Sequence, residues 1–204
     1  MSTSIIMKST RQYVMTARAE AVAQTRERIL RAAIGRTDRH PLATVSLGDI
    51  ASDAGVSVQT VLRQFGSRDG VIDAGIELAL SEITEELLHA PHADLPGAIS
   101  VIVDHHEARG DIAILLLGQE AGDPHAARVT TQGRAMHRTW VESVFTPLLG
   151  DITGSEREEM IDMLVIATDV YTWKILRRDR GLSRKVVERR MLRLAETVLE
   201  EWAS

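Results

Sequence analysis

Residues 46–66 constrain the fold more than any other segment, because they read as a helix, a tight turn and a second short helix. Ala51 is small enough to let two helices approach closely, and Gly55 suits the sharp turn between them. Val61 and Phe65 lie four residues apart and form the buried side of the second helix. This pattern predicts a helix-turn-helix, whose second helix is shaped to enter the major groove of DNA.

The ends of both short helices carry capping signals. Ser46 is the expected N-cap of the first, and Asp49, three residues later, makes an acidic variant of the capping box. Ser57 is the expected N-cap of the second helix. Apolar periodicity and glycine or proline breaks predict helices at about 17–35, 47–54, 58–64, 68–89, 96–108, 111–120, 124–148, 156–179 and 184–202.

The predicted fold is therefore all-α, with about nine helices. A three-helix head containing the helix-turn-helix is joined by a long helix to a C-terminal helical bundle. We expect a flexible N-terminal extension at 1–22, a DNA-binding domain at 23–70, and a ligand-binding and dimerisation domain at 71–204. The low aromatic content, 3%, also argues against a sheet-rich fold.

Charge is divided unevenly along the chain. Residues 1–70 carry ten Lys and Arg against six Asp and Glu, whereas residues 71–204 carry 14 against 23. A basic head on an acidic body suits a DNA-reading domain with a separate regulatory part. Cysteine is absent, which excludes disulfides and thiolate metal sites and is compatible with the cytoplasm, the location that we expect.

The second short helix has one face that is left free by its buried anchors. Gln59 and Arg63 can hydrogen-bond base edges, and Val58 and Leu62 suit a thymine methyl group. Hydroxyl, amide and guanidinium groups nearby can contact phosphates. The predicted DNA-binding residues are Ser46, Ser57, Val58, Gln59, Thr60, Leu62, Arg63, Gln64 and Arg68.

Four short segments, at 25–33, 45–51, 54–57 and 65–68, resemble the DNA-binding head of TetR-family transcriptional regulators. The resemblance covers about residues 25–75. It implies a homodimer that binds a palindromic operator and a small effector that alters the spacing of the heads. It also implies phosphate contacts by Thr60 and Arg68. This chain departs from the family at Leu62, usually an aromatic residue, and at Gln64, often histidine, so specificity should depend more on Gln59 and Arg63.

The predicted body offers two further sets of residues. A row of large side chains in helix 124–148, together with residues of neighbouring helices, could line an apolar effector pocket. Helices 156–179 and 184–202 could pack against their copies as a four-helix interface, although a central core helix with a covering helix is an equal alternative. The pocket set is His106, Leu116, Met136, His137, Trp140, Met163 and Tyr171; the interface set is Ile161, Val165, Trp173, Val187, Met191, Leu194, Val198 and Trp202.

Other kinds of site have little support. Residues 104–107 read Asp-His-His-Glu, but neighbouring side chains on a helix point about 100° apart and cannot converge on one metal. We expect no catalytic residue, cofactor or metal, and no membrane span, since the longest apolar run is Ile112–Leu117. A ligand-responsive repressor is thus the main hypothesis. The alternatives are a helical enzyme or carrier with a structural head, and a protein-interaction adaptor.

Overall fold

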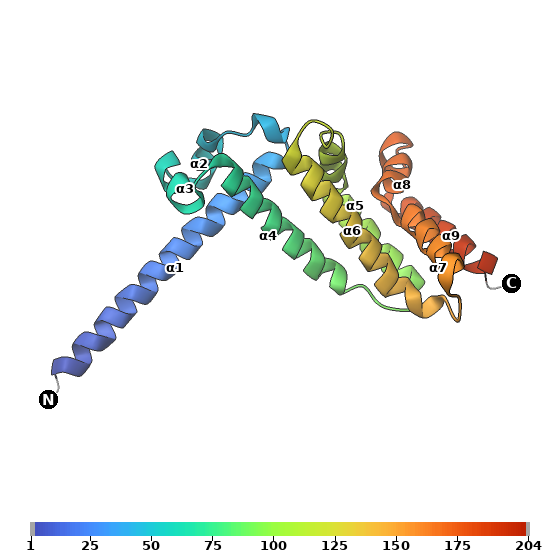
Figure 1. Ribbon diagram of the computed structural model, residues 1–204, viewed down its shortest axis with the longest axis horizontal. Coiled ribbons are helices and arrows are strands. Elements are labelled where there is room, and N and C mark those ends of the chain that lie inside the picture. Colours follow the sequence, from blue (N-terminus) through green and yellow to red (C-terminus); the bar gives the residue numbers. More distant parts are fainter. Residues whose placement is uncertain (1–2, 203–204) are drawn as a thin grey trace. The chain divides into compact units, whose positions relative to one another are not determined.

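The computed structural model describes the backbone of residues 3–202 and the side chains of residues 16–201. All regular structure in that range is helical, which confirms the all-α prediction, and the expected number of about nine helices is approximately right. The elements, labelled in Figure 1, are α1 (Thr3–Thr37), η1 (Leu42–Thr44), α2 (Leu47–Ala54), α3 (Val58–Phe65), α4 (Arg68–Leu88), α5 (Leu95–Leu117), α6 (Pro124–Phe145), η2 (Thr146–Leu148), α7 (Gly154–Thr168), α8 (Val170–Lys174), η3 (Ile175–Asp179) and α9 (Arg184–Trp202).

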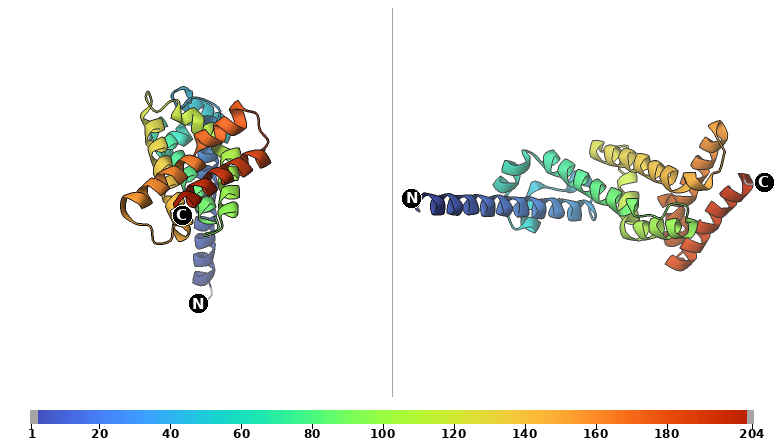
Figure 2. Two further views of the ribbon diagram at one scale, coloured as in Figure 1. Left: turned by 90° about the vertical axis from the view of Figure 1, so that its right-hand side faces the viewer. Right: turned by 90° about the horizontal axis from the view of Figure 1, so that it is seen from below.

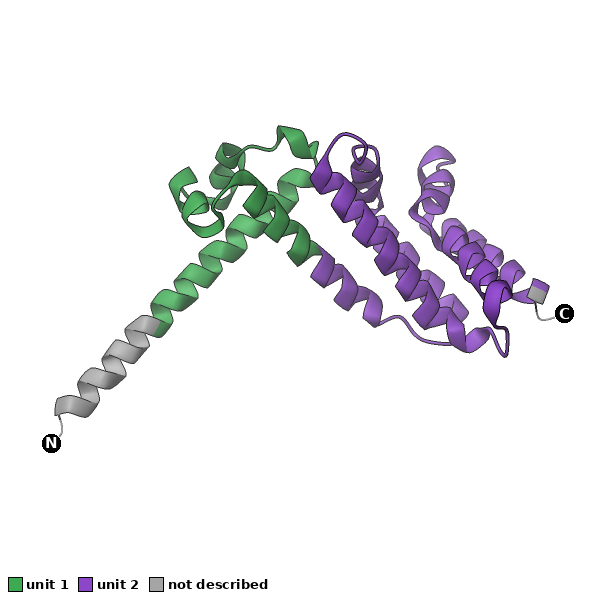
Figure 3. Ribbon diagram, viewed as in Figure 1, with its two compact units in different colours: residues 1–79 green, residues 80–204 purple. Residues whose placement is uncertain are grey.

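The chain divides into two compact units, residues 1–79 and 80–204, which are coloured separately in Figure 3. The division falls inside α4, a single continuous helix. Helix α1 begins at Thr3 rather than near residue 17, and the sequence has no glycine or proline before Gly35 that would interrupt it. The domain limits and the flexibility expected of residues 1–22 stay predictions, and residues 1 and 2 lie outside the described residues.

Unit 1 is built around a small apolar core. Ile29 of α1, Ile50 of α2, Val61 of α3 and Val71 of α4 are all fully buried. Val45, just after η1, is also buried and closes one side of this core. Each of the four helices thus contributes an apolar face, and this packing fixes the orientation of the short helix α3.

Unit 2 has a larger core, shared by the C-terminal helices seen in Figure 2. Helices α7 and α9 pack against each other, and α5 packs against α6, α8 and α9. Trp173 of α8 and Phe145 of α6 are the largest fully buried side chains in this core. No helix within residues 3–202 combines the length and apolar character needed to cross a membrane.

In unit 2, two of the expected helix divisions differ from those observed. The segments 96–108 and 111–120 form one helix, α5, because Gly110 lies inside it as a packing position and not as a break. A Cβ atom at Gly110 would lie 2.4 Å from the Trp173 ring, so glycine is required for close contact. Conversely, the expected helix 156–179 is interrupted at Asp169, whose extended backbone (φ −69°, ψ 151°) ends α7 and whose carboxylate caps α8.

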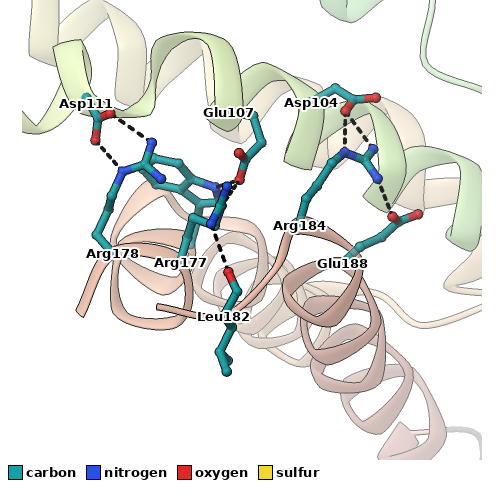
Figure 4. Close-up of polar contacts among 9 residues, drawn as sticks. Asp104, Glu107, Asp111, Arg177, Arg178, Leu182, Arg184 and Glu188 are labelled. Carbon is teal, nitrogen blue, oxygen red and sulfur yellow. Dashed lines mark hydrogen bonds and ion pairs between the residues drawn. The ribbon is translucent and has the colours of Figure 1, made fainter. Parts of the chain in front are cut away.

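Three ion pairs fasten the segment after α8 to one face of α5 (Figure 4). Glu107 of α5, which pairs with Arg177, also accepts a hydrogen bond at 2.9 Å from the indole Nε1 of Trp173. The closest nitrogen–oxygen distances are 2.7 Å for Arg177–Glu107, 2.8 Å for Arg178–Asp111 and 2.6 Å for Arg184–Asp104. Two of the four consecutive residues 104–107 therefore point toward arginines.

Candidate nucleic-acid interface

Helix α2 begins at the predicted capping box. The backbone N–H of Asp49 donates to Ser46 Oγ at 3.1 Å, and the Ser46 backbone N–H donates to the Asp49 carboxylate at 3.2 Å. The Ser46 hydroxyl also donates to the Asp49 carboxylate, at 2.6 Å, and this bond, together with the one from the Ser46 backbone N–H, lowers the pKa of the Asp49 carboxyl below its usual value. The start of α2 is thereby fixed by its own sequence, as expected for this motif.

The turn between α2 and α3 is also as predicted. Gly55 has the left-handed conformation (φ 65°, ψ 38°), which glycine adopts without steric cost. The next backbone N–H, of Val56, donates to the Ala51 carbonyl at 3.0 Å and closes the turn. Ser57 then caps α3 by accepting a bond from the Thr60 backbone N–H at 3.2 Å, and its Oγ lies 3.0 Å from Thr60 Oγ1.

Helix α3 is held at its far end by Arg26 of α1, a residue that no local sequence signal marks. The Arg26 guanidinium lies over the Phe65 ring, 4.3 Å from its centroid, and donates to the Gln64 carbonyl at 3.3 Å. A second arginine of α1, Arg36, donates to the Asp53 carboxylate of α2 at 2.7 Å. Both contacts join residues far apart in sequence, so no local pattern could have identified them.

The solvent side of α3 presents the residues expected to read DNA. Gln59 and Arg63 are exposed and lie four positions apart, hence on one face of the helix. Val58 is also exposed, at 40%, and is therefore free to contact a thymine methyl group. Of the other predicted contacts, Ser46 and Ser57 are exposed, and Thr60, Leu62 and Gln64 are half-buried. This geometry brings the base-reading candidates together on one surface.

Arg68 has a role that the sequence did not predict. Its Nε donates to the Val45 carbonyl at 2.7 Å, and its two terminal nitrogens bond the Leu42 carbonyl and the Asp69 carboxylate. The guanidinium therefore braces η1 against the start of α4. A phosphate contact by Arg68 stays a prediction, and it would have to share donors that are already engaged.

Only part of the expected pocket set comes together in unit 2. His106 and His137 both bond to Thr168, and the His137 ring stacks on Trp140 with their centroids 6.1 Å apart. Met163 and Tyr171 are instead 41% and 50% exposed, so they do not line an enclosed space among the described residues. The two remaining members, Leu116 and Met136, are half-buried.

Most of the predicted interface set belongs to the core of unit 2, and the prediction is wrong for those residues. Their apolar stripe faces the chain's own helices, and periodicity alone cannot tell such a stripe from one that faces a second subunit. Leu194 is 46% exposed, Val165 is half-buried, and the side chain of Trp202 lies outside the described residues. The buried members are Ile161, Trp173, Val187, Met191 and Val198.

Similarity to known proteins agrees with this geometry. Residues 29–74 match the model of bacterial regulatory proteins of the tetR family. A transcriptional regulator from Rhodococcus sp. Rha1 is similar in structure over 86% of this chain and 96% of its own, with 18% identity and a TM-score of 0.67. A tetR-family transcriptional regulator from Streptomyces coelicolor is similar over 89% and 82%, with 16% identity and a TM-score of 0.70.

No curated protein matches the chain. The two solved structures share its fold over most of their length, and the family match covers its whole helix-turn-helix. Residues 29–74 therefore carry the helix-turn-helix DNA-binding domain of the tetR family of bacterial regulatory proteins, and the chain shares its overall fold with these two regulators.

Proposed function

We propose that the chain is a ligand-responsive repressor that binds a palindromic operator as a homodimer in the cytoplasm. The observation that carries this proposal is the exposed face of α3, where Gln59 and Arg63 lie side by side on a helix that its neighbours hold rigidly. An amide and a guanidinium are the side-chain groups that pair bidentately with adenine and guanine edges. Rigid placement of both favours sequence-specific over merely electrostatic binding.

The homodimer is supported by apolar side chains that the fold of one chain leaves uncovered. Met163 and Ile166 of α7 are 41% and 60% exposed, and Leu194 of the adjoining helix α9 is 46% exposed. A second copy is the partner that we assign to this surface, because a two-fold dimer presents two copies of α3. Paired recognition helices about 34–36 Å apart enter successive major grooves and account for a palindromic site.

We assign the effector-binding site to unit 2 because polar groups are buried in its core. His106 is only 5% exposed, and the indole Nε1 of Trp140 is buried without a hydrogen-bond partner. A few polar groups inside an apolar surround are typical of sites that orient a small ligand. Binding there would shift the equilibrium between head spacings and so release the operator.

The proposal is tested by selecting bound sequences from random duplex DNA with the full-length protein and then repeating the selection with candidate effectors. We expect an enriched palindrome, bound in a salt-dependent manner, and its loss when the right effector is present. Weak binding without any enriched sequence would contradict the proposal. It would favour a helical carrier, enzyme or adaptor whose head is structural.

Replacing Arg63 by alanine should weaken binding to the selected operator by roughly 1–3 kcal/mol, because one bidentate base contact is lost. Arg63→Lys is the matched control, since it retains the charge and removes the planar fork. We expect Arg63→Lys to bind non-specific DNA like the wild type while losing discrimination at one operator position. Titrations over several salt concentrations measure both quantities, and unchanged operator affinity of Arg63→Ala would refute this assignment.

A further inference from the structure

Two imidazoles from different helices bond to one threonine in the core of unit 2. His106 of α5 places its Nε2 at 2.9 Å from the Thr168 carbonyl oxygen, and His137 of α6 places its Nε2 at 3.0 Å from Thr168 Oγ1. Thr168 is fully buried and His106 is 5% exposed. Thr168, the residue that ends α7, is thus held from two sides, by the buried His106 and by the half-buried His137.

The donors and acceptors of this group define the protonation of both rings. A carbonyl oxygen can only accept, so His106 must donate from Nε2. The hydroxyl of Thr168 donates its one proton to the Leu164 carbonyl at 2.8 Å, so His137 must also donate from Nε2. Each neutral ring therefore carries its single proton on Nε2, and protonation at Nδ1 adds a positive charge to the buried ring of His106 or to the half-buried ring of His137.

The surroundings make that extra charge costly. Burial lowers the pKa of His106 to about 3 and that of His137 to about 4. His105, whose ring centroid lies 5.5 Å from that of His106, adds to the effect on both rings, and burial lowers its own pKa as well. The charged groups facing this cluster are Glu86 of α4, Arg109 of α5 and Asp169 before α8.

Thr168 lies at the junction between α7 and α8, so its contacts can affect how these two helices are joined. Thr168 is the last residue of α7, and Asp169, which follows it in an extended conformation, accepts a bond from the Tyr171 backbone N–H at 2.7 Å. A change at Thr168 therefore moves the junction between two helices. It also acts on α7 itself, which carries the exposed Met163 and Ile166.

We propose that His106, His137 and Thr168 form an acid-sensitive latch at the C-terminal end of α7, closed while both rings are neutral and opened when they take up protons. Opening separates the rings from Thr168 and lets the imidazolium groups reach water. The existence of the latch does not depend on the proposed function. The expected effect of its opening, which is loss of the dimer surface and of operator affinity in acid, does rest on the homodimeric repressor proposed above.

The pH range follows from the two states of each ring. An imidazole in water has a pKa near 6.5, and the closed latch holds it well below that value. The open state binds more protons, so opening becomes more favourable as the pH falls below about 6.5. Each ring shifts the opening equilibrium about tenfold per pH unit until the pH approaches its closed-state pKa, and two rings together shift it about a hundredfold.

The experiment compares the wild type with the double variant His106→Gln, His137→Gln, in which neutral amides can still donate to Thr168. Amide hydrogen exchange, corrected for the intrinsic effect of pH, is followed in peptides covering 160–174 at pH 7, 6 and 5 without DNA. We expect exchange in the wild type to rise steeply below pH 6 in these peptides before it rises in α5. The double variant should show no such pH dependence.

His89→Gln is the matched control, since His89 is exposed at the end of α4 and its Nδ1 bonds the Glu85 carbonyl. This variant should behave like the wild type. The latch is refuted if the double variant keeps the acid response, or if all of unit 2 exchanges at once. Should the double variant not fold, imidazole NMR titration of the wild type decides, because ordinary pKa values for both rings would also refute it. If the latch opens but no operator is found, only the consequence for DNA binding fails.

Discussion

Replacing Gly110 by alanine should destabilise unit 2 by about 3 kcal/mol, although it adds a single methyl group. The new Cβ would lie 2.4, 2.7 and 2.8 Å from three atoms of the Trp173 ring, well inside van der Waals contact. The ring cannot easily retreat. It is fully buried, its Nε1 donates to Glu107, and the Arg178 guanidinium lies 4.5 Å from its centroid. Urea unfolding followed by circular dichroism measures the loss.

Gly133→Ala provides the matched control within the same unit. Gly133 is also a helical glycine, in α6, but a Cβ there would meet no atom within 4 Å. Alanine should therefore stabilise the protein by roughly 0.5–1 kcal/mol, the usual gain in a helix interior. Opposite signs for the two variants would establish Gly110 as a packing position. Equal effects would show that the ring can move away after all.

The head could be predicted closely from sequence because its signals are local. The Ser46 capping box, the left-handed Gly55 and the Ser57 cap each depend on residues within four positions of one another. Apolar anchors at Val61 and Phe65 then fix which side of α3 faces the core. The exposure of Gln59 and Arg63 follows directly from that choice.

The body was harder to predict because its decisive contacts are long-range. Gly110 looked like a helix end, and only the tryptophan 63 positions later shows why glycine is needed there. The break at Asp169 lies in a segment with neither glycine nor proline, so no local signal marks it. In the head, the same limit applies to the structural contacts of Arg68, since its partners Leu42 and Val45 are more than 20 positions away.

The interface set shows a different limit. Val187 and Met191 belong to an apolar stripe along one face of α9, as predicted, but this stripe packs into the core of the subunit itself. An outer face is recognised by the apolar side chains that stay exposed after the core has formed. Met163 and Ile166 are two such side chains, and their exposure can be seen only in the three-dimensional structure. The dimer surface proposed here therefore rests on exposure.

Replacing Ile166 by aspartate should raise the dimer dissociation constant at least about a hundredfold, because a carboxylate would be buried without a partner at the interface. A two-fold dimer contains the substitution twice, so the effect is doubled. The fold of the single chain should survive, since Ile166 is 60% exposed. Operator affinity should fall in parallel because one head contacts one half-site. Sedimentation equilibrium and operator titration measure the two losses.

Leu88→Asp makes the same chemical change at an apolar residue of α4 that is 72% exposed. Because Leu88 lies on neither α7 nor α9, this variant should dimerise and bind the operator like the wild type. The contrast separates loss of a specific contact from a general effect of added negative charge. If both variants stay dimeric, the dimer uses another surface. If Ile166→Asp is monomeric yet keeps full operator affinity, the operator is read by one head, and the palindrome has no structural basis in this protein.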